Sequence, residues 1–263
     1  MKGPVYPVLG KGMLRQFSKL GGKKYRDEAG IFLAEGLRTV RELLDHLPSE
    51  EMLVALMIGP GADHESVRPE RCAGKVYSIG KEQEARLAQT TTPQGVFGVF
   101  RQMPAWRQGT KMPSFVVALD DVQDPGNVGT IVRTAAWFGA DAVVCGRGTA
   151  DPFNAKAVRS SAGSLYAVGL DRTENLGSRL QLFRQAGYLI IASTLDGSDY
   201  RSVDGLTDLR VLVVGNEANG ISGSILELAD RLVKIPHSGD RARVESLNAA
   251  VSAAILMSGL AFA

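Results

Sequence analysis

The sequence predicts an α/β protein of two domains, the second built around a parallel sheet. A chain of 263 residues that is 44% apolar and 22% charged is long enough for one large folded domain or two of ordinary size. Short apolar runs alternate along it with segments in which apolar residues recur at helical spacing. In the second half these runs are continuously apolar, which is typical of parallel strands covered on both faces.

The first hundred residues predict a small α/β unit. Apolar runs such as IFLAE and LVALMI indicate strands, and the segments between them carry the 3.6-residue spacing of amphipathic helices. Strands are expected at 31–35, 53–58, 75–79 and 95–100, and helices at 37–47 and 81–89.

A basic segment without periodicity separates the two halves. The run RQMPAWRQGTKMP contains two prolines and no acidic residue, as expected of an interdomain linker. We therefore place the first domain at residues 1–106, the linker at 107–113 and the second domain at 114–263.

The second half alternates apolar strands with helices. Its functional loops are expected at the carboxyl ends of the strands, because ligands of open parallel sheets bind there. The apolar run 249–263 is shorter than the roughly 20 residues that span a bilayer, which favours a buried helix or a subunit interface. Strands are expected at 115–120, 142–145, 166–170, 189–193, 211–215 and 232–235.

Positive charge is concentrated near the amino terminus. Residues 1–41 contain nine Lys and Arg against three Asp and Glu, although the whole chain carries a net charge of only +2. Such a basic arm suits contact with a phosphate backbone, where cations displace condensed counterions; a solvated helix face explains it equally well. The first interpretation assigns RNA contacts to Lys11, Arg15, Lys23, Lys24, Arg26 and Arg38.

Other features narrow the class of protein. The first twelve residues lack the apolar region of a secretory signal, so the cytoplasm is the expected location, with no membrane partner. Cys72 and Cys145 occur without CxxC or paired His spacing, which predicts two buried thiols and no metal site. Trp106 and Trp137 are predicted to pack against other side chains, and stacking on a base is the alternative.

The first of three polar segments that follow strands is 121–140, in which the turn Asp124-Pro125-Gly126 precedes a helix. Asn127 is predicted to cap that helix, and Arg133 lies one to two turns inside it. An arginine on a solvated helix face would look the same.

The second segment, VLVVGNEANGIS at 211–222, is a strand that ends in a Gly-rich turn containing Glu217. The glycines allow the backbone to approach a ligand closely. Ser222 or Ser224 is predicted to cap the next helix, with Glu227 completing a capping box. A purely structural turn is the alternative.

The third segment, 233–257, passes from a strand and Pro236 through a polar loop into ESLN and a helix of small residues. Core packing explains the alanines of that helix, but it does not explain ESLN following IP.

Taken together, NVGTIVR, GNEANGIS and IP…ESLNAAVSAA resemble the three ordered motifs of the SpoU/TrmH family of SPOUT methyltransferases. FLAEGLRTVRELL and TTPQGVFGVF are similar to the L30e-like RNA-binding domain that accompanies this family. The resemblance implies a C-terminal parallel-sheet domain with a deep trefoil knot, a homodimer, and methylation of a ribose 2′-hydroxyl in structured RNA by S-adenosylmethionine. Ribosomal RNA of the 23S type is the expected substrate, and transfer RNA the alternative.

The resemblance also assigns roles to individual positions. Asn127, Arg133 and Glu217 match the catalytic residues, with Arg133 acting on the ribose hydroxyl. The sequence departs from the family pattern at two places. Ala250 stands where many members have Ser, and the loop at 237–244 is longer than usual and contains Arg241 and Arg243. Cofactor contacts are implied for Thr194, Gly215, Asn216, Gly220, Ile235, Pro236, Ser246, Leu247 and Asn248.

Two rival interpretations compete with this one. Gly146-Arg147-Gly148 after an apolar strand, with Asp171 ending a later strand, mimics part of a dinucleotide-binding fingerprint whose third glycine is missing. A noncatalytic RNA-binding or ribosome-associated protein of the same fold would also have the basic arm. The joint presence of Asn127, Arg133, Glu217 and Asn248 argues against both.

Overall fold

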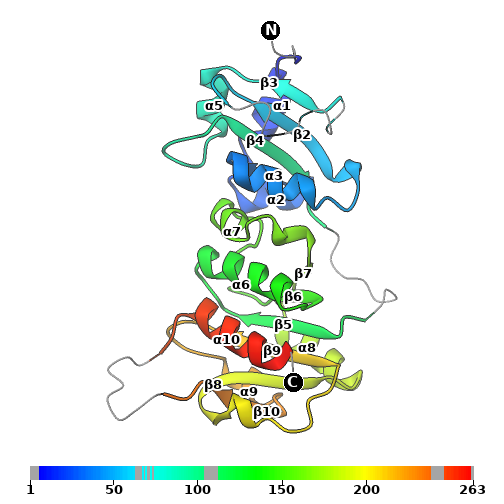
Figure 1. Ribbon diagram of the computed structural model, residues 1–263, viewed down its shortest axis with the longest axis vertical. Helices are drawn as coiled ribbons and strands as arrows, with labels where there is room; N and C mark the ends of the chain where they lie inside the picture. Colours follow the sequence, from blue (N-terminus) through cyan, green and yellow to red (C-terminus); the bar gives the residue numbers. More distant parts are fainter. Residues whose placement is uncertain are drawn as a thin grey trace. The chain divides into compact units, whose positions relative to one another are not determined.

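A computed structural model describes residues 6–62, 67, 69, 72, 74–103, 112–237 and 246–261. The chain forms two compact units, which Figure 1 labels by element. The first contains the described residues up to Met103 together with Phe153–Tyr166, and the second contains the other described residues. Linker residues 107–111, Trp106, Arg241 and Arg243 lie outside the described residues, and the predicted domain limits stay a prediction.

The first unit has a four-stranded mixed sheet of order β1-β4-β2-β3. β4 runs antiparallel to β1 and β2, and β2 runs parallel to β3. The strands predicted at 31–35 and 53–58 are confirmed at both ends. The elements are α1 (Lys11–Phe17), α2 (Lys23–Ala29), β1 (Ile31–Glu35), α3 (Leu37–Asp45), η1 (Glu50–Met52), β2 (Leu53–Ile58), β3 (Val76–Ser78), α5 (Lys81–Leu87), β4 (Val96–Arg101), α7 (Ala155–Ser160) and η3 (Ser164–Tyr166).

The described part of the basic arm includes two short helices, which the sequence interpretation did not assign. α1 buries Leu14 and Phe17, and Leu20 in the turn after it joins the same core cluster as Phe97 of β4. Burial of these apolar side chains fixes the helices on the sheet, because isolated helices of this length are unstable in water.

Aromatic side chains tie the segment Phe153–Tyr166 into the first unit. The Phe32 ring centroid lies 5.7 Å from that of Phe100 and 5.2 Å from that of Phe153. The Tyr166 hydroxyl donates to the Arg101 carbonyl at 2.7 Å. The strand predicted at 166–170 is therefore wrong at its start: Tyr166 ends a 3₁₀ turn, and the strand begins at Gly169.

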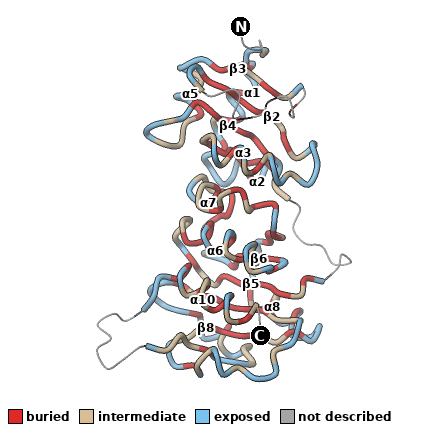
Figure 2. The backbone as a smooth tube through the Cα atoms, viewed as in Figure 1, coloured by how far each residue is buried: buried red, intermediate tan, exposed pale blue. Residues whose placement is uncertain are grey.

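The second unit has a six-stranded sheet of order β10-β8-β9-β5-β6-β7, in which every pairing is parallel. The predicted parallel sheet is confirmed, and Figure 2 shows its strands as mainly buried. Its elements are β5 (Phe115–Asp120), α6 (Pro125–Trp137), β6 (Ala142–Cys145), β7 (Gly169–Arg172), α8 (Leu176–Gln185), β8 (Leu189–Asp199), η4 (Tyr200–Ser202), β9 (Arg210–Gly215), α9 (Gly223–Leu226), β10 (Arg231–Lys234) and α10 (Ala249–Ala261).

Helices cover both faces of this sheet. Leu180 of α8 and Ile225 of α9 pack with Val116, Val213 and other alternate residues of the strands. On the opposite face α6 and α10 pack against each other, and α10 also contacts β9 (Figure 1). The helix predicted from the apolar C-terminal run is α10. The trefoil knot implied by the family resemblance stays a prediction.

Both cysteines are buried, as predicted, and neither forms a disulfide. Burial, reinforced by the nearby Asp151 carboxylate, raises the pKa of Cys145 to about 12, so its thiol is neutral. No helix in the described ranges is long and apolar enough to cross a membrane. Those ranges also hold no cluster of three or more His, Cys, Asp or Glu side chains placed to share a metal ion.

Candidate functional site

The site of the second unit lies where the order of the strands reverses. β5 begins the unit and leads outward through β6 to β7, whereas β9 pairs with the other side of β5. The register pairs Asp120 with Gly215, so the two strands end at the same level. The loops that follow them, one leading to Asn127 and the other containing Glu217, are thereby brought together at the position where open parallel sheets bind ligands.

A chain of side-chain hydrogen bonds joins the three predicted motifs. Asn127 Nδ2 donates to Glu217 Oε1 at 2.6 Å, and Asn248 Nδ2 donates to Asn127 Oδ1 at 3.0 Å. Asn248 Oδ1 in turn accepts from the backbone N–H groups of Ala250 and Val251 at 3.0 and 3.2 Å, as a residue capping α10 does. We call Glu217, Asn127 and Asn248 the amide relay.

One predicted helix cap is wrong. α6 begins at Pro125 and its cap is Asp124, whose Oδ1 accepts from the Gly126 N–H at 3.0 Å. Asn127 is instead the third residue of α6, and its side chain forms the amide relay. Ser222 occupies the N-cap position of α9, as one of the two predicted alternatives, but its side chain forms no cap bond. Ser224 lies inside α9, so the capping box predicted from it does not form.

Glycine is required at position 215 by close backbone packing. A Cβ atom there would lie 2.4 Å from the Gly220 carbonyl carbon and 2.5 Å from the Ile221 nitrogen. The turn closes through a two-bond bridge between Asn216 and Gly220, both bonds measuring 2.9 Å, with Gly220 at a φ of +68°. The sequence GNEANG therefore specifies a tight turn that presents Glu217.

Asp121 supports this turn and was missed by sequence reasoning. Its backbone lies in the left-handed region, with a φ of 60°, which is uncommon for a residue with a side chain. Asn216 Nδ2 donates to the Asp121 carbonyl at 2.9 Å and to its Oδ2 at 3.0 Å. The only signal in the sequence was a second Asp directly after the strand.

The glycines of the rival dinucleotide motif have structural explanations. A Cβ at Gly146 would lie 2.9 Å from the Leu119 carbonyl oxygen, and one at Gly148 would lie 2.0 Å from Asp121 Oδ1. Asp171 forms an ion pair with Arg179 at 2.9 Å, and burial raises the pKa of Asp171. Gly146 and Gly148 therefore pack against β5 and the turn after it.

A cavity of about 1100 Å³ is lined by the middle of β8, the carboxyl end of β9, the residues just after β10 and the start of α10. The strand predicted at 189–193 continues to Asp199, so Thr194 lies within β8 and not at its end. The cavity is as large as the biggest sites for small ligands, which span roughly 300–1,000 Å³. Eight of the nine predicted cofactor residues line it, together with Glu217: Thr194, Gly215, Asn216, Gly220, Ile235, Pro236, Ser246 and Leu247. Further lining residues that were not predicted include Ser193, Leu195, Asp196, Ala218, Asn219, Ile221, Leu226, His237, Ala249 and Ser252.

One polar atom in this cavity has no hydrogen-bond partner. Thr194 Oγ1 is buried, and no donor or acceptor lies within bonding distance among the described residues. Buried polar groups in folded proteins are nearly always bonded, so an orphan hydroxyl in a cavity wall indicates a place for a polar ligand group.

The remaining predicted site residues lie outside the cavity lining. Asn127 and Asn248 are connected to it through the amide relay. The Arg133 side chain is exposed on α6, less than two turns after Asn127, and forms no ion pair with the described residues.

The RNA-contacting candidates of the first unit fall into two groups. Arg26 is only 3% exposed, and its Nη1 donates to the Leu20 and Gly21 carbonyls at 2.7 and 2.8 Å. This buried position gives Arg26 a structural role. The exposed candidates are Lys11, Arg15, Lys23, Lys24 and Arg38, of which the last three pair with Asp27, Glu28 and Glu42.

An all-parallel α/β unit with a ligand-sized cavity and a polar relay at the ends of its strands is the architecture of an enzyme that binds a nucleotide-like ligand. Residues 114–258 match the model of the SpoU rRNA Methylase family, and residues 12–98 match the MRM3-like substrate binding domain. The chain belongs to the SpoU family of RNA methyltransferases.

Individual relatives agree with this assignment. The chain is 34% identical to the Bacillus subtilis 23S rRNA (guanosine(2553)-2′-O)-methyltransferase RlmP, an alignment that covers 93% of this chain and 94% of that protein. The structure of an AdoMet-bound rRNA methyltransferase from Sinorhizobium meliloti is similar, with a TM-score of 0.76, 32% identity, and 97% and 95% of the two chains covered. The SpoU methyltransferase AviRb from Streptomyces viridochromogenes, solved with AdoMet, has a TM-score of 0.79 at 26% identity over 96% and 98% of the chains.

Proposed function

We propose that the protein methylates a ribose 2′-hydroxyl of 23S ribosomal RNA with S-adenosylmethionine as methyl donor. The observation that carries this proposal is the amide relay, which joins the three family motifs through hydrogen bonds of 2.6 and 3.0 Å. A relay of this kind at the edge of a cavity holds a carboxylate in one orientation, as an enzyme requires for the groups around its reacting atoms.

The cavity fits the proposed cofactor. Its apolar wall, which includes Val214, Ile221 and Leu226, suits a nucleoside base, and the Thr194 hydroxyl offers an unused polar contact. The backbone groups of Gly215, Ile235 and Leu247 would supply further hydrogen bonds in the proposed complex. When bound, S-adenosylmethionine supplies an electrophilic methyl group.

The protein's own residues would position the RNA ribose and stabilise the negative charge that develops on its 2′-oxygen. Alignment of two bound reactants contributes roughly 7–11 kcal/mol to lowering a barrier, so orientation is the main task of the site. The Arg133 guanidinium is exposed, and its positive charge suits it to bind an RNA phosphate or to stabilise negative charge developing on the ribose oxygen. Asn127 orients the Glu217 carboxylate at the cavity wall.

Ribosomal RNA is proposed as substrate because two of the relatives named above, from Bacillus subtilis and Sinorhizobium meliloti, are rRNA methyltransferases according to their names. Exposed cations of the first unit would contact its phosphates, with Lys11 and Arg15 free of ion pairs to the described residues. The proposed substrate carries with it a location in the cytoplasm, where ribosomes are assembled in bacteria.

A homodimer is part of the proposal. Trp137 on α6 is 84% exposed, so the prediction that it packs within the chain is wrong. Leu247 and Val251, at and near the start of α10, are 47% and 48% exposed, and α10 packs on α6. Exposed apolar residues on two adjoining helices suit a subunit interface. Light scattering should give the mass of two chains, and Trp137→Glu should give the mass of one.

The activity is tested with Arg133→Ala. This variant should bind S-adenosylmethionine with unchanged affinity by calorimetry, but it should lose methyl transfer to rRNA from a strain that lacks the enzyme. Arg231→Ala is the matched control, because Arg231 is an exposed arginine at the amino end of β10, away from the cavity edge. Full activity of Arg133→Ala would overturn the assigned role, and methylation of transfer RNA alone would overturn the proposed substrate.

A further inference from the structure

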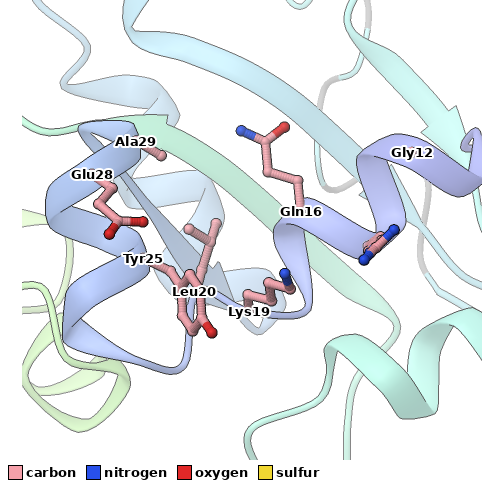
Figure 3. Close-up of a pocket in the computed structure, with 8 residues that line it drawn as sticks. Gly12, Gln16, Lys19, Leu20, Tyr25, Glu28 and Ala29 are labelled. Carbon is pink, nitrogen blue, oxygen red and sulfur yellow. The ribbon is translucent and has the colours of Figure 1, made fainter.

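A second cavity, of about 500 Å³, lies within the first unit between α1 and α2. Arg15 lines it from α1, Lys19 and Leu20 from the following turn, and Tyr25 and Glu28 from α2. Figure 3 shows the Tyr25 ring next to Lys19 and Leu20, with Glu28 one turn farther along the same helix. These residues lie within the region that matches the MRM3-like substrate binding domain, although none of the motifs quoted above includes them.

The wall of this cavity is held in place from inside the unit. The buried Arg26 guanidinium donates to the Leu20 and Gly21 carbonyls, which fixes the turn between the two helices. The Tyr25 ring lies against that turn, since a Cβ at Gly22 would be 3.1 Å from Tyr25 Cδ2. Tyr25 is therefore presented on a fixed backbone, and its ring loses little freedom when a ligand covers it.

The chemistry of the cavity combines an aromatic ring with two cations that form no ion pair. Tyr25 is 42% exposed, and Lys19 Nζ lies over the face of its ring, 5.2 Å from the centroid. A base that stacks on this face would displace the Lys19 ammonium group from the ring. Arg15 and Lys19 form no ion pair with the described residues, whereas the neighbouring Lys23 and Lys24 pair with acids one turn away. Aromatic rings flanked by cations are how proteins bind single-stranded nucleic acid, the ring stacking on a base and the cations contacting phosphates.

We propose that this cavity binds one unpaired base of the RNA substrate, with the base stacked on Tyr25 and with Arg15 and Lys19 on the flanking phosphates. The proposal rests on the RNA substrate class proposed above. An unpaired base is required because a base within a duplex does not expose its face. The Glu28 carboxylate, which only accepts hydrogen bonds, also lines the cavity, where it would accept from an amino group on the edge of the base.

The test measures binding of the full-length protein to a short mixed-sequence single-stranded RNA carrying one 2-aminopurine. Tyr25→Ala should weaken binding roughly 5- to 150-fold, the range measured when one stacking residue is removed, and should abolish the 2-aminopurine quenching. Tyr25→Phe should bind as the wild type does, because it keeps the ring. A fully paired version of the same RNA should bind Tyr25→Ala and wild type equally.

The salt dependence of RNA affinity distinguishes the contribution of the cations from that of the Tyr25 ring. Arg15→Ala should lower the slope of log affinity against log salt by about one phosphate contact, whereas Tyr25→Ala and the control Arg231→Ala should leave it unchanged. In methylation assays Tyr25→Ala should raise KM for RNA and leave S-adenosylmethionine affinity unchanged. Wild-type affinity and quenching in a folded Tyr25→Ala would overturn this inference, even if the wild type methylates rRNA. Tight RNA binding without methyl transfer by the wild type would instead overturn the proposed function alone.

Discussion

The two cavities are built in opposite ways. The cavity of the second unit brings together residues from β8, β9, β10 and the start of α10, and its amide relay joins side chains that lie far apart in the sequence. The cavity of the first unit is lined entirely by residues 12–29 and depends on one buried arginine. Removal of one long-range hydrogen bond in the second unit should therefore disturb the motifs of its cavity together. A change in the first unit should disturb only the residues around its own cavity.

The largest effect is expected from Asn127→Ala, which removes the centre of the amide relay. Glu217 Oε1 would lose its donor and Asn248 its acceptor, so the two neighbouring motifs would no longer share a fixed geometry. Misplacement of reacting groups by about 1 Å can reduce a rate roughly 100-fold, and we expect a loss of that order in kcat for methyl transfer. Steady-state kinetics with radiolabelled methyl donor measure it.

A double-mutant cycle tests whether the residues of the amide relay act together. Asn127→Ala combined with Glu217→Ala should cost much less than the sum of the two single losses, since either change already breaks the same bond. Asn127→Ala combined with Arg231→Ala should be additive. Additive losses in the first pair would mean that the amide relay does not work as a unit.

Arg26→Met tests the local character of the first cavity. The substitution keeps an apolar stem but removes the donors to the Leu20 and Gly21 carbonyls, at a cost of about 1.5–3 kcal/mol for hydrogen bonds to a charged group. Hydrogen exchange should increase in residues 11–29 and stay unchanged in the second unit. Lys24→Met, an exposed change on the same helix, is the control. Faster exchange throughout the chain would contradict the expectation that Arg26 stabilises only the region around the first cavity.

The second unit was largely predictable from its sequence because its strands are continuously apolar and its motifs are ordered. β5 and β6 begin and end as predicted, and nearly all of the predicted cofactor residues line one cavity. Sequence reasoning failed where a side chain has two possible uses. Asn127 has the chemistry of a helix cap, yet Asp124 takes that role and leaves Asn127 to bond Glu217, a residue that only the pairing of β5 with β9 brings near.

The first unit was predictable in its strands but less so in its surface. A count of charges placed Arg26 among the RNA contacts, but it cannot tell an exposed cation from one whose guanidinium is buried against backbone carbonyls. Nor did the sequence show that Phe153 and Tyr166, which follow two strands of the second unit, complete the aromatic core around Phe32. Contacts between distant segments leave no periodic signal in the sequence.

The smallest effect is expected from Thr194→Val. This substitution changes the wall of the second unit's cavity without touching the amide relay, so it tests the wall by itself. A buried Oγ1 without a bonding partner costs free energy, so its removal should leave the unfolding free energy of the protein unchanged or slightly higher. Cofactor affinity should fall by about 0.5–1.5 kcal/mol, the net value of one hydrogen bond. Thr194→Ser keeps the hydroxyl and should bind normally. Calorimetric titration decides the point: if the valine variant binds S-adenosylmethionine as tightly as the serine variant, the hydroxyl does not face the ligand.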